Sequence, residues 1–415
     1  MAVAMSPYIM GCLVIGLLLL TVSWGSQWIN RLPLSYAIIY LVMGVILGPY
    51  GVGLINLQPG SEVLEHFTEL VVIVSLYGCG LRINRSLKAS HWRLTVRLVV
   101  WLMPLSILAV AAVGHWLLSL SWAAALLLGA ILSPTDPVLA SDVQLNHPKD
   151  QSKLRFGLTS EGGLNDALAF PFVYFGLHWI HDPDLSHWLR QWVLIDLLWA
   201  IAAAIVVGFG VAKSVVWLNH QAQMTKGLSE EMADLVALGV IFLTYGLTEL
   251  INGYGFLAVF VAGMVVRIHG FYPEQQQSQL RFITQIEKLL EVGAILLLGS
   301  LLRLEQISEF GLEAIILAAF LLLLIRPLGT WICTAGTRIH SSTRLLSGWF
   351  GIRGIGSLYY LSYAVSEGLP GPIIAELRWV TYLTVIISIV IHGITATPLV
   401  NWHERQLGKH QPESS

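Results

Sequence analysis

The chain has 415 residues, of which 55% are hydrophobic and only 12% are charged, and its mean hydropathy is +0.71. Soluble proteins carry about 25% charged residues, so this composition predicts a polytopic membrane protein rather than a soluble enzyme. The net charge of −2 offers no basic surface for nucleic acid, and the 3 cysteines lie in apolar stretches without the spacing of a disulfide framework or a metal site. We expect no nucleic-acid partner and no cofactor.

Hydropathy predicts an all-α protein with about thirteen transmembrane helices. Because little sequence is left between them, we expect one transmembrane domain over residues 1–400 and a short cytoplasmic tail over 401–415. The N-terminus has no basic residue before its first apolar stretch, which favours a retained span over a signal peptide. The predicted spans are 7–27, 33–50, 64–82, 96–119, 121–144, 158–179, 190–217, 234–252, 254–270, 284–302, 312–335, 345–366 and 378–400.

The positive charges predict the orientation of these spans, because cytoplasmic loops are enriched in Lys and Arg. With the N-terminus outside, 18 of the 23 Lys and Arg residues fall in inner loops or the tail. The outer loops hold only Arg190, Arg303 and Arg378, and the membrane interior holds Arg326 and Arg353. We therefore expect the N-terminus outside and the C-terminus in the cytoplasm.

The span over 121–144 is interrupted by the sequence SPTDP, in which Pro134 and Pro137 flank Thr135 and Asp136. Proline has no N–H, so this segment frees backbone carbonyls from their helical bonds. Hydroxyl, carboxylate and carbonyl oxygens together suit a hard cation. A simple proline kink is the alternative, but an acid between two prolines within a span favours an ion site.

The span over 345–366 contains GIRGIGS, in which Gly351, Gly354 and Gly356 surround Arg353 and weaken the helix. The odd number of spans allows six spans, a linker and six inverted spans. In transporters with inverted repeats, broken helices at matching positions of the two halves form the binding site. We therefore expect these two interrupted spans to line one site.

The sequence EGGLND places Glu161, Asn165 and Asp166 in a stretch otherwise apolar enough for lipid. An ionisable side chain at this depth costs about 3 kcal/mol and marks an ion or proton pathway. On a helix, Glu161 and Asn165 share one face, whereas Gly162 and Asp166 share a neighbouring one. Because glycine leaves the approach to Asp166 open, Asp166 is predicted to be the working carboxylate.

Buried charges need partners, because an unpaired one costs roughly 3–5 kcal/mol. Glu161 with Arg326 and Asp136 with Arg353 are the expected pairs, although the sequence alone also permits the crossed arrangement. His392, in the last span, is expected to be a core histidine rather than a pH sensor.

These motifs, SPTDP, EGGLND, IRPLG and GIRGIGS, resemble those of the monovalent cation:proton antiporters of the NhaP and sodium/proton exchanger type. The resemblance runs from about residue 8 to 400 and implies a homodimer with a dimerisation domain and a six-helix core. It also implies that spans 5 and 12 cross as broken helices, in a bacterial-type inner (plasma) membrane.

Carried over to this chain, the resemblance assigns cation and proton binding to Asp166, Asn165, Thr135 and Asp136. It makes Glu161 and Arg326 a structural ion pair and Arg353 the charge that compensates the helix crossing. The bound cation, Na⁺, Li⁺ or K⁺, would sit at Asp166 and Thr135. Gly162 replaces the serine found in many members, so water or a backbone carbonyl must replace that hydroxyl.

Two other classes of protein also carry acidic residues within the membrane. An intramembrane aspartyl protease would use two aspartates that share a proton, but its GxGD signature is absent from the sequence. An inverted-repeat channel or a transporter of another small ion is the stronger rival, and proton flux that depends on the substrate cation would distinguish it.

The predicted orientation can be tested with a reporter fused to the C-terminus. A reporter that is active only in the cytoplasm should be active, because the inner loops carry most of the positive charge. Activity of a periplasmic or extracellular reporter at the same position would reverse the assigned topology.

Overall fold

A computed structural model describes residues 35–56 and 61–408, apart from 84, 87, 137–138, 140–144, 146–149, 151, 226–229, 271–272, 303–306 and 338. It also describes residues 9, 11, 13–17 and 19–21 near the N-terminus. All regular secondary structure in these residues is helical, as the sequence predicts.

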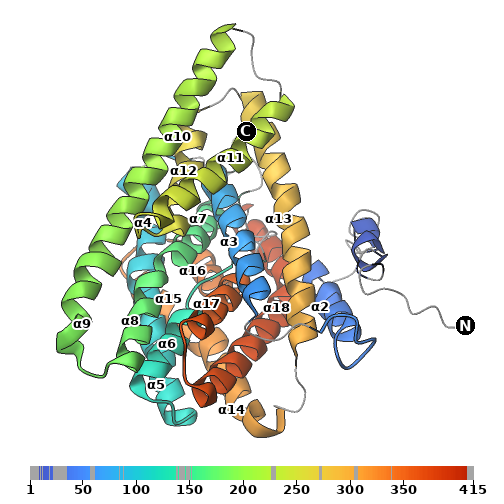
Figure 1. Cartoon of the computed structure of the whole chain (residues 1–415), viewed down its shortest axis with the longest axis vertical. Coiled ribbons are helices and arrows are strands. Elements are labelled where there is room, and N and C mark those ends of the chain that lie inside the picture. Colours follow the sequence, from blue (N-terminus) through green and yellow to red (C-terminus); the bar gives the residue numbers. More distant parts are fainter. Residues whose placement is uncertain are drawn as a thin grey trace, which may run out of the picture.

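Figure 1 shows the arrangement of the helices. π-helical turns over Arg97–Leu102, Trp192–Trp199 and Phe320–Ile325 join neighbouring helices into longer rods. The helices are α2 Tyr36–Leu47, α3 Glu62–Arg82, α4 Ala89–Val96, α5 Met103–Leu117, α6 Trp122–Leu132, α7 Lys153–Leu168, α8 Phe170–His181, α9 Leu185–Gln191, α10 Ala200–Thr225, α11 Glu230–Glu249, α12 Gly255–His269, α13 Pro273–Leu301, α14 Ile307–Ala319, α15 Arg326–Cys333, α16 Ser341–Trp349, α17 Ile355–Ser366 and α18 Gly371–Gly408.

Six continuous helical stretches among the described residues are long and apolar enough to cross a membrane. Several of the other predicted spans are divided or shorter. In the span predicted over 121–144, helix α6 ends at Leu132 and the described residues 133–136 are not helical, and the span over 345–366 is divided between α16 and α17. The span over 158–179 begins earlier, at Lys153, and changes direction between α7 and α8. The first predicted span, 7–27, lies largely outside the described residues.

Large apolar side chains on the outside of the helix assembly are exposed, as lipid contact requires. Examples are Trp116, Val206 and Trp217, which are 76%, 69% and 60% exposed. An apolar surface of this extent would be an aggregation hazard in water, whereas hydrocarbon solvates it without cost. These faces therefore identify the lipid-exposed boundary of the protein.

Helix α3 lies at the centre of the assembly and packs against α7, α12, α13 and α17 (Figure 1). Its approach to α12 depends on Gly80 and Gly263, which face each other where the two backbones are closest. A Cβ atom on Gly80 would lie 2.8 Å from the backbone nitrogen of Met264, and one on Gly263 would lie 3.2 Å from the Cα of Gly80. Small residues of this kind allow membrane helices to pack closely.

We expect Gly80→Ala and Gly263→Ala each to destabilise the protein by roughly 1–3 kcal/mol, because the added methyl group meets backbone atoms that cannot rotate away. The matched control is Gly210→Ala in α10, where a Cβ atom would meet nothing within 4 Å. That change should be neutral or stabilise the helix by up to about 1 kcal/mol. Thermal unfolding in detergent measures all three, and equal effects at the three sites would contradict the close-packing argument.

Candidate functional site

The two interrupted segments meet each other inside the protein. The first follows α6 and comprises Ser133, Pro134, Thr135 and Asp136, and the second is residues 350–354, between α16 and α17. The backbone N–H of Asp136 donates a hydrogen bond to the carbonyl oxygen of Ile352 at 2.8 Å. Chain segments more than 200 residues apart therefore satisfy each other's backbone groups, as non-helical backbone within a membrane requires.

Arg353 compensates the carboxyl end of α6. Its Nη1 donates to the carbonyl oxygen of Ser133 and, at 3.0 Å, to that of Pro134. These are carbonyls at the negative end of a helix dipole, where a cation is favourable. Its Nε and Nη2 are buried and have no hydrogen-bond partner among the described residues.

Asp136 compensates the amino end of α17, as Arg353 compensates the carboxyl end of α6. Its Oδ2 accepts from the backbone N–H of Ile355 at 2.7 Å, and its Oδ1 accepts from that of Leu139 at 3.2 Å. A carboxylate at a helix N-terminus is stabilised by the positive end of the dipole. The sequence predicts Arg353 as the counter-charge of Asp136. The hydrogen bonds of Arg353 described above go to carbonyl groups at the end of α6, and the amino end of α17 supports Asp136.

Glu161 and Arg326 lie side by side in the protein interior. The guanidinium donates two parallel bonds to the carboxylate, at 2.6 and 2.8 Å, and a third to the carbonyl oxygen of Ser347 at 3.2 Å. The side chains are 0% and 3% exposed. Arg326 begins α15 directly after the π-helical turn, and Gly351 leaves room for it, because a Cβ atom there would lie 2.5 Å from Nε. Glu161 therefore pairs with Arg326, as expected, and not with Arg353 as in the crossed arrangement.

Asn165 connects this pair with the first interrupted segment. Its Nδ2 donates to Oε1 of Glu161 at 3.3 Å and, at a long 3.5 Å, to the hydroxyl of Thr135. With its N–H groups used in this way, the amide presents its Oδ1, which is buried and has no hydrogen-bond partner among the described residues. The amide therefore supplies a free acceptor.

Asp166 is the neighbouring residue on α7 and is only 3% exposed. Its Oδ1 is also buried and without a hydrogen-bond partner in the described part of the chain. Gly356 packs against it, since a Cβ atom there would lie 2.5 Å from Oδ1. Its backbone carbonyl accepts a hydrogen bond from the hydroxyl of Tyr360. An unpartnered buried carboxylate oxygen is costly, so this atom is suited to receive a proton or a hard cation.

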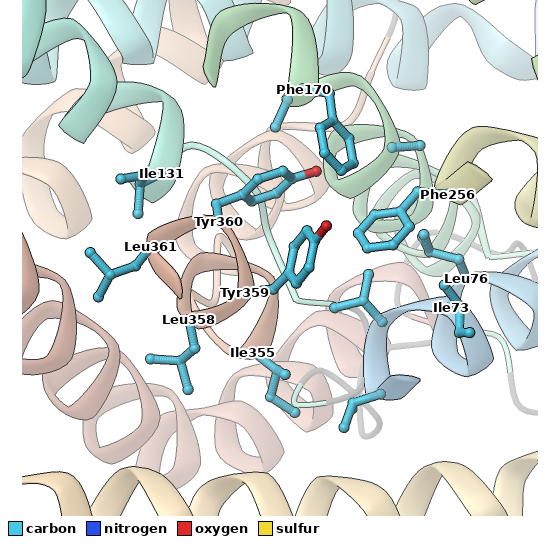
Figure 2. Close-up of a cluster of buried hydrophobic side chains, with 14 of the residues drawn as sticks. Ile73, Leu76, Ile131, Phe170, Phe256, Ile355, Leu358, Tyr359, Tyr360 and Leu361 are labelled. Atoms are coloured by element: carbon cyan, nitrogen blue, oxygen red, sulfur yellow. The ribbon is translucent and has the colours of Figure 1, made fainter. Parts of the chain in front are cut away.

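The rings of Phe170, Phe256, Tyr359 and Tyr360 lie close together in the interior of the protein (Figure 2). Phe170 of α8 lies 5.1 Å from both Phe256 of α12 and Tyr360 of α17, and Phe256 lies 4.9 Å from Tyr359, measured between ring centroids. The rings come from three helices and pack edge to face or tilted. Because Phe170 begins α8 just after α7, these buried rings lie next to the end of α7 that follows Asp166, the end predicted to face outside.

A second buried ion pair was not identified from the sequence. Arg82 ends the predicted span over 64–82 and was counted with the inner loop that follows; it is the last residue of α3, and its side chain is buried against α13. It donates to the carboxylate of Glu287 at 2.5 and 3.0 Å and to the hydroxyl of Thr284 at 3.0 Å. The sequence feature related to this ion pair is Gly78, one helical turn before Arg82. A side chain at this position would collide with the Glu287 carboxylate.

Two discontinuous helices that meet at membrane depth, beside a buried carboxylate with a free oxygen, are the architecture of secondary transporters. The sequence agrees with this class of protein, because residues 14–402 match the sequence model of the family "sodium/hydrogen exchanger, transmembrane". The chain therefore belongs to the sodium/hydrogen exchanger family.

Relatives and a solved structure support this assignment. The K⁺/H⁺ antiporter NhaP of Alkalimonas amylolytica is 24% identical over 96% of this chain and 67% of the relative. A probable Na⁺/H⁺ antiporter of Schizosaccharomyces pombe is 24% identical over 88% of this chain and 52% of the relative. This chain thus spans between about half and two thirds of their lengths. The sodium proton antiporter MjNhaP1 of Methanocaldococcus jannaschii has the same fold, with a TM-score of 0.75 and 21% identity over 95% of this chain and 98% of that one.

We expect Glu161→Gln to destabilise the protein by roughly 3–5 kcal/mol, because it leaves the Arg326 guanidinium buried without its counter-charge. Adding Arg326→Met should restore much of the stability. The control is Glu404→Gln, which breaks the exposed pair between Glu404 and Arg155 and should change stability by about 1 kcal/mol or less. Thermal unfolding of the purified variants measures this, and a Glu161→Gln protein that is as stable as wild type yet inactive would show that the pair is not structural.

Proposed function

We propose that this protein is a secondary active transporter that exchanges a monovalent cation, Na⁺, Li⁺ or K⁺, for H⁺ across the membrane. The observation that supports this most directly is that Oδ1 of the buried Asp166 carboxylate has no hydrogen-bond partner in the described part of the chain. The carboxylates of Glu161 and Glu287 are held by arginines, and that of Asp136 accepts from backbone N–H groups. Asp166 is thus the member of this group left to bind the transported ions.

The mechanism follows from competition at one carboxylate. Burial disfavours the charged form of Asp166, so the empty site takes up a proton, whereas a bound cation stabilises the carboxylate and displaces that proton. If the protein changes conformation only when Asp166 is neutralised, each cycle carries one positive charge in each direction. Exchange is then one for one and electroneutral, driven by the pH gradient. Asn165 supplies an amide at the adjacent position and cannot carry a second proton.

The identity of the cation depends on the oxygen ligands around Asp166. Thr135 and Asn165 provide a hydroxyl and an amide oxygen, and Gly162 provides none from its side chain. A K⁺-selective antiporter is the second candidate, because one relative above is named a K⁺/H⁺ antiporter. A transporter or channel for another small ion is the remaining alternative, and a lack of coupling between cation and proton flux would favour it.

The proposal extends to the setting of the protein in the cell. We propose a homodimer in a bacterial-type plasma membrane, with the N-terminus outside and the C-terminus in the cytoplasm. The division into a transmembrane domain over 1–400 and a tail over 401–415 belongs to the same proposal. The lipid-exposed apolar faces support the membrane location, and the distribution of Lys and Arg supports the orientation.

Asp166→Asn should abolish exchange while leaving the protein folded, because the amide can neither release a proton nor neutralise a cation. Dye-reported exchange in reconstituted vesicles, with Na⁺, Li⁺ and K⁺ in turn, measures the loss and identifies the transported cation. The control is Asp196→Asn, at a carboxylate that contacts His178 outside the site and should be dispensable.

Two results would contradict the proposal. One is exchange that survives in Asp166→Asn. The other is a steady current that follows membrane voltage at zero pH gradient, because electroneutral exchange moves no net charge.

A further inference from the structure

Helix α18 contacts both ends of the second interrupted segment through two buried polar side chains. Ser388 is 0% exposed and its hydroxyl accepts a hydrogen bond from the backbone N–H of Arg353 at 2.8 Å. One turn later, Nε2 of His392 lies 2.8 Å from the carbonyl oxygen of Trp349, and this histidine is 3% exposed. Trp349 is the last residue of α16 and Arg353 lies just before α17.

The two side chains are also bonded to each other, so the contacts form one chain of hydrogen bonds. Nδ1 of His392 lies 3.2 Å from the hydroxyl of Ser388 and 2.8 Å from the Ser388 carbonyl oxygen, and Nε2 lies 2.8 Å from the carbonyl oxygen of Trp349. The imidazole ring therefore bridges Ser388 and Trp349. The chain therefore runs from the Arg353 N–H through both side chains to the Trp349 carbonyl.

A third contact strengthens the hold on the first end of the segment. The indole Nε1 of Trp349 donates to the hydroxyl of Thr395 on α18 at 3.0 Å. Other hydroxyls of α18 differ from these, because Oγ1 of Thr381 and of Thr384 is buried without a hydrogen-bond partner among the described residues. Ser388, His392 and Thr395 thus each provide a polar contact from α18 to this part of the chain.

Residues 350–354, which α18 contacts, are the segment that meets the first interrupted segment, residues 133–136. Its Ile352 carbonyl receives the N–H of Asp136, its Arg353 guanidinium reaches Ser133 and Pro134, and Gly356, on the first turn of α17, packs against Asp166. A shift of residues 350–354 would move the partners of both Asp136 and Asp166. No residue of α18 was assigned to the site from the sequence, and His392 was expected to be an ordinary core histidine.

We propose that Ser388 and His392 are positioning residues for cation exchange, which fix both ends of the interrupted segment and so keep the cation site assembled. The inference rests on the proposed exchange function. We call these contacts of Ser388 and His392 with Arg353 and Trp349 the tether. Without the tether, only a fraction of the protein molecules have an assembled cation site, and the apparent cation affinity falls by that fraction. A role in folding alone would lower the amount of active protein without changing the KM for the cation.

The test compares Ser388→Ala and His392→Phe with Thr384→Val, which removes a hydroxyl without a hydrogen-bond partner one turn away on the same helix. Loss of one hydrogen bond in the tether should raise the KM for the cation roughly two- to tenfold, and Thr384→Val should leave it unchanged. His392→Gln retains an amide donor near the position of Nε2 and should lie closer to wild type than His392→Phe. The double variant Ser388→Ala/His392→Phe should be no worse than the more affected single variant, because both interrupt one chain.

A second measurement separates this inference from the proposed function. Added Na⁺, Li⁺ or K⁺ stabilises the purified protein against heat to an extent set by its binding affinity, with no need for transport. If the wild type binds a cation but does not exchange it, the proposed function is wrong and the tether is still tested by affinity. If Ser388→Ala and His392→Phe bind the cation as tightly as wild type and Thr384→Val, or if their effects add in the double variant, the tether does not position the site.

Discussion

Backbone N–H and C=O groups cannot remain unsatisfied within a membrane, and this constraint governs the centre of the protein. Interrupting α6 and separating α16 from α17 exposes such groups in both halves of the chain. The two segments resolve this by bonding to each other, with Arg353 at the carboxyl end of α6 and Asp136 at the amino end of α17. Each interruption thus depends on the other, so the two halves of the chain must fold around one crossing.

The same reasoning explains why several buried charges coexist near this crossing. Arginines hold Glu161 and Glu287 through paired hydrogen bonds, and helix ends support Asp136 and Arg353. A buried charge that is compensated in this way is fixed, because removing its partner would leave it uncompensated at a cost of several kcal/mol. Such groups form a rigid electrostatic frame and are poor candidates for repeated ion binding.

Much of this arrangement could be predicted from the sequence, because it depends on local chemistry. Prolines around Thr135 and Asp136 and glycines around Arg353 marked the interruptions, and charges in apolar stretches marked Glu161 and Arg326. Partner choice was less accessible, since it depends on which helices meet. The predicted span over 64–82 ends at Arg82 and the charge count assigned this residue to the following inner loop, whereas its side chain is buried against Glu287 of α13.

The contribution of α18 was hidden for a related reason. A histidine and a serine one turn apart in an apolar helix are compatible with ordinary packing, and their role depends on the segment that lies opposite. Helix limits were missed where polar residues continue a helix, as at the start of α7 and α13 and the end of α18. For Ser388 and His392, the sequence gives the chemistry of the side chain, and only the fold shows which groups it contacts.

Asp166 stands apart from this frame, and the difference explains how a rigid centre can bind and release ions. Its backbone is fixed by Tyr360 and its carboxylate is confined by Gly356, yet Oδ1 has no hydrogen-bond partner in the described residues. The adjacent Asn165 uses its N–H groups on Glu161 and Thr135 and leaves Oδ1 free. Within the described residues, both of these oxygens are acceptors that a cation or a proton can complete. Because either one would neutralise the same carboxylate, the cation and the proton compete for Asp166.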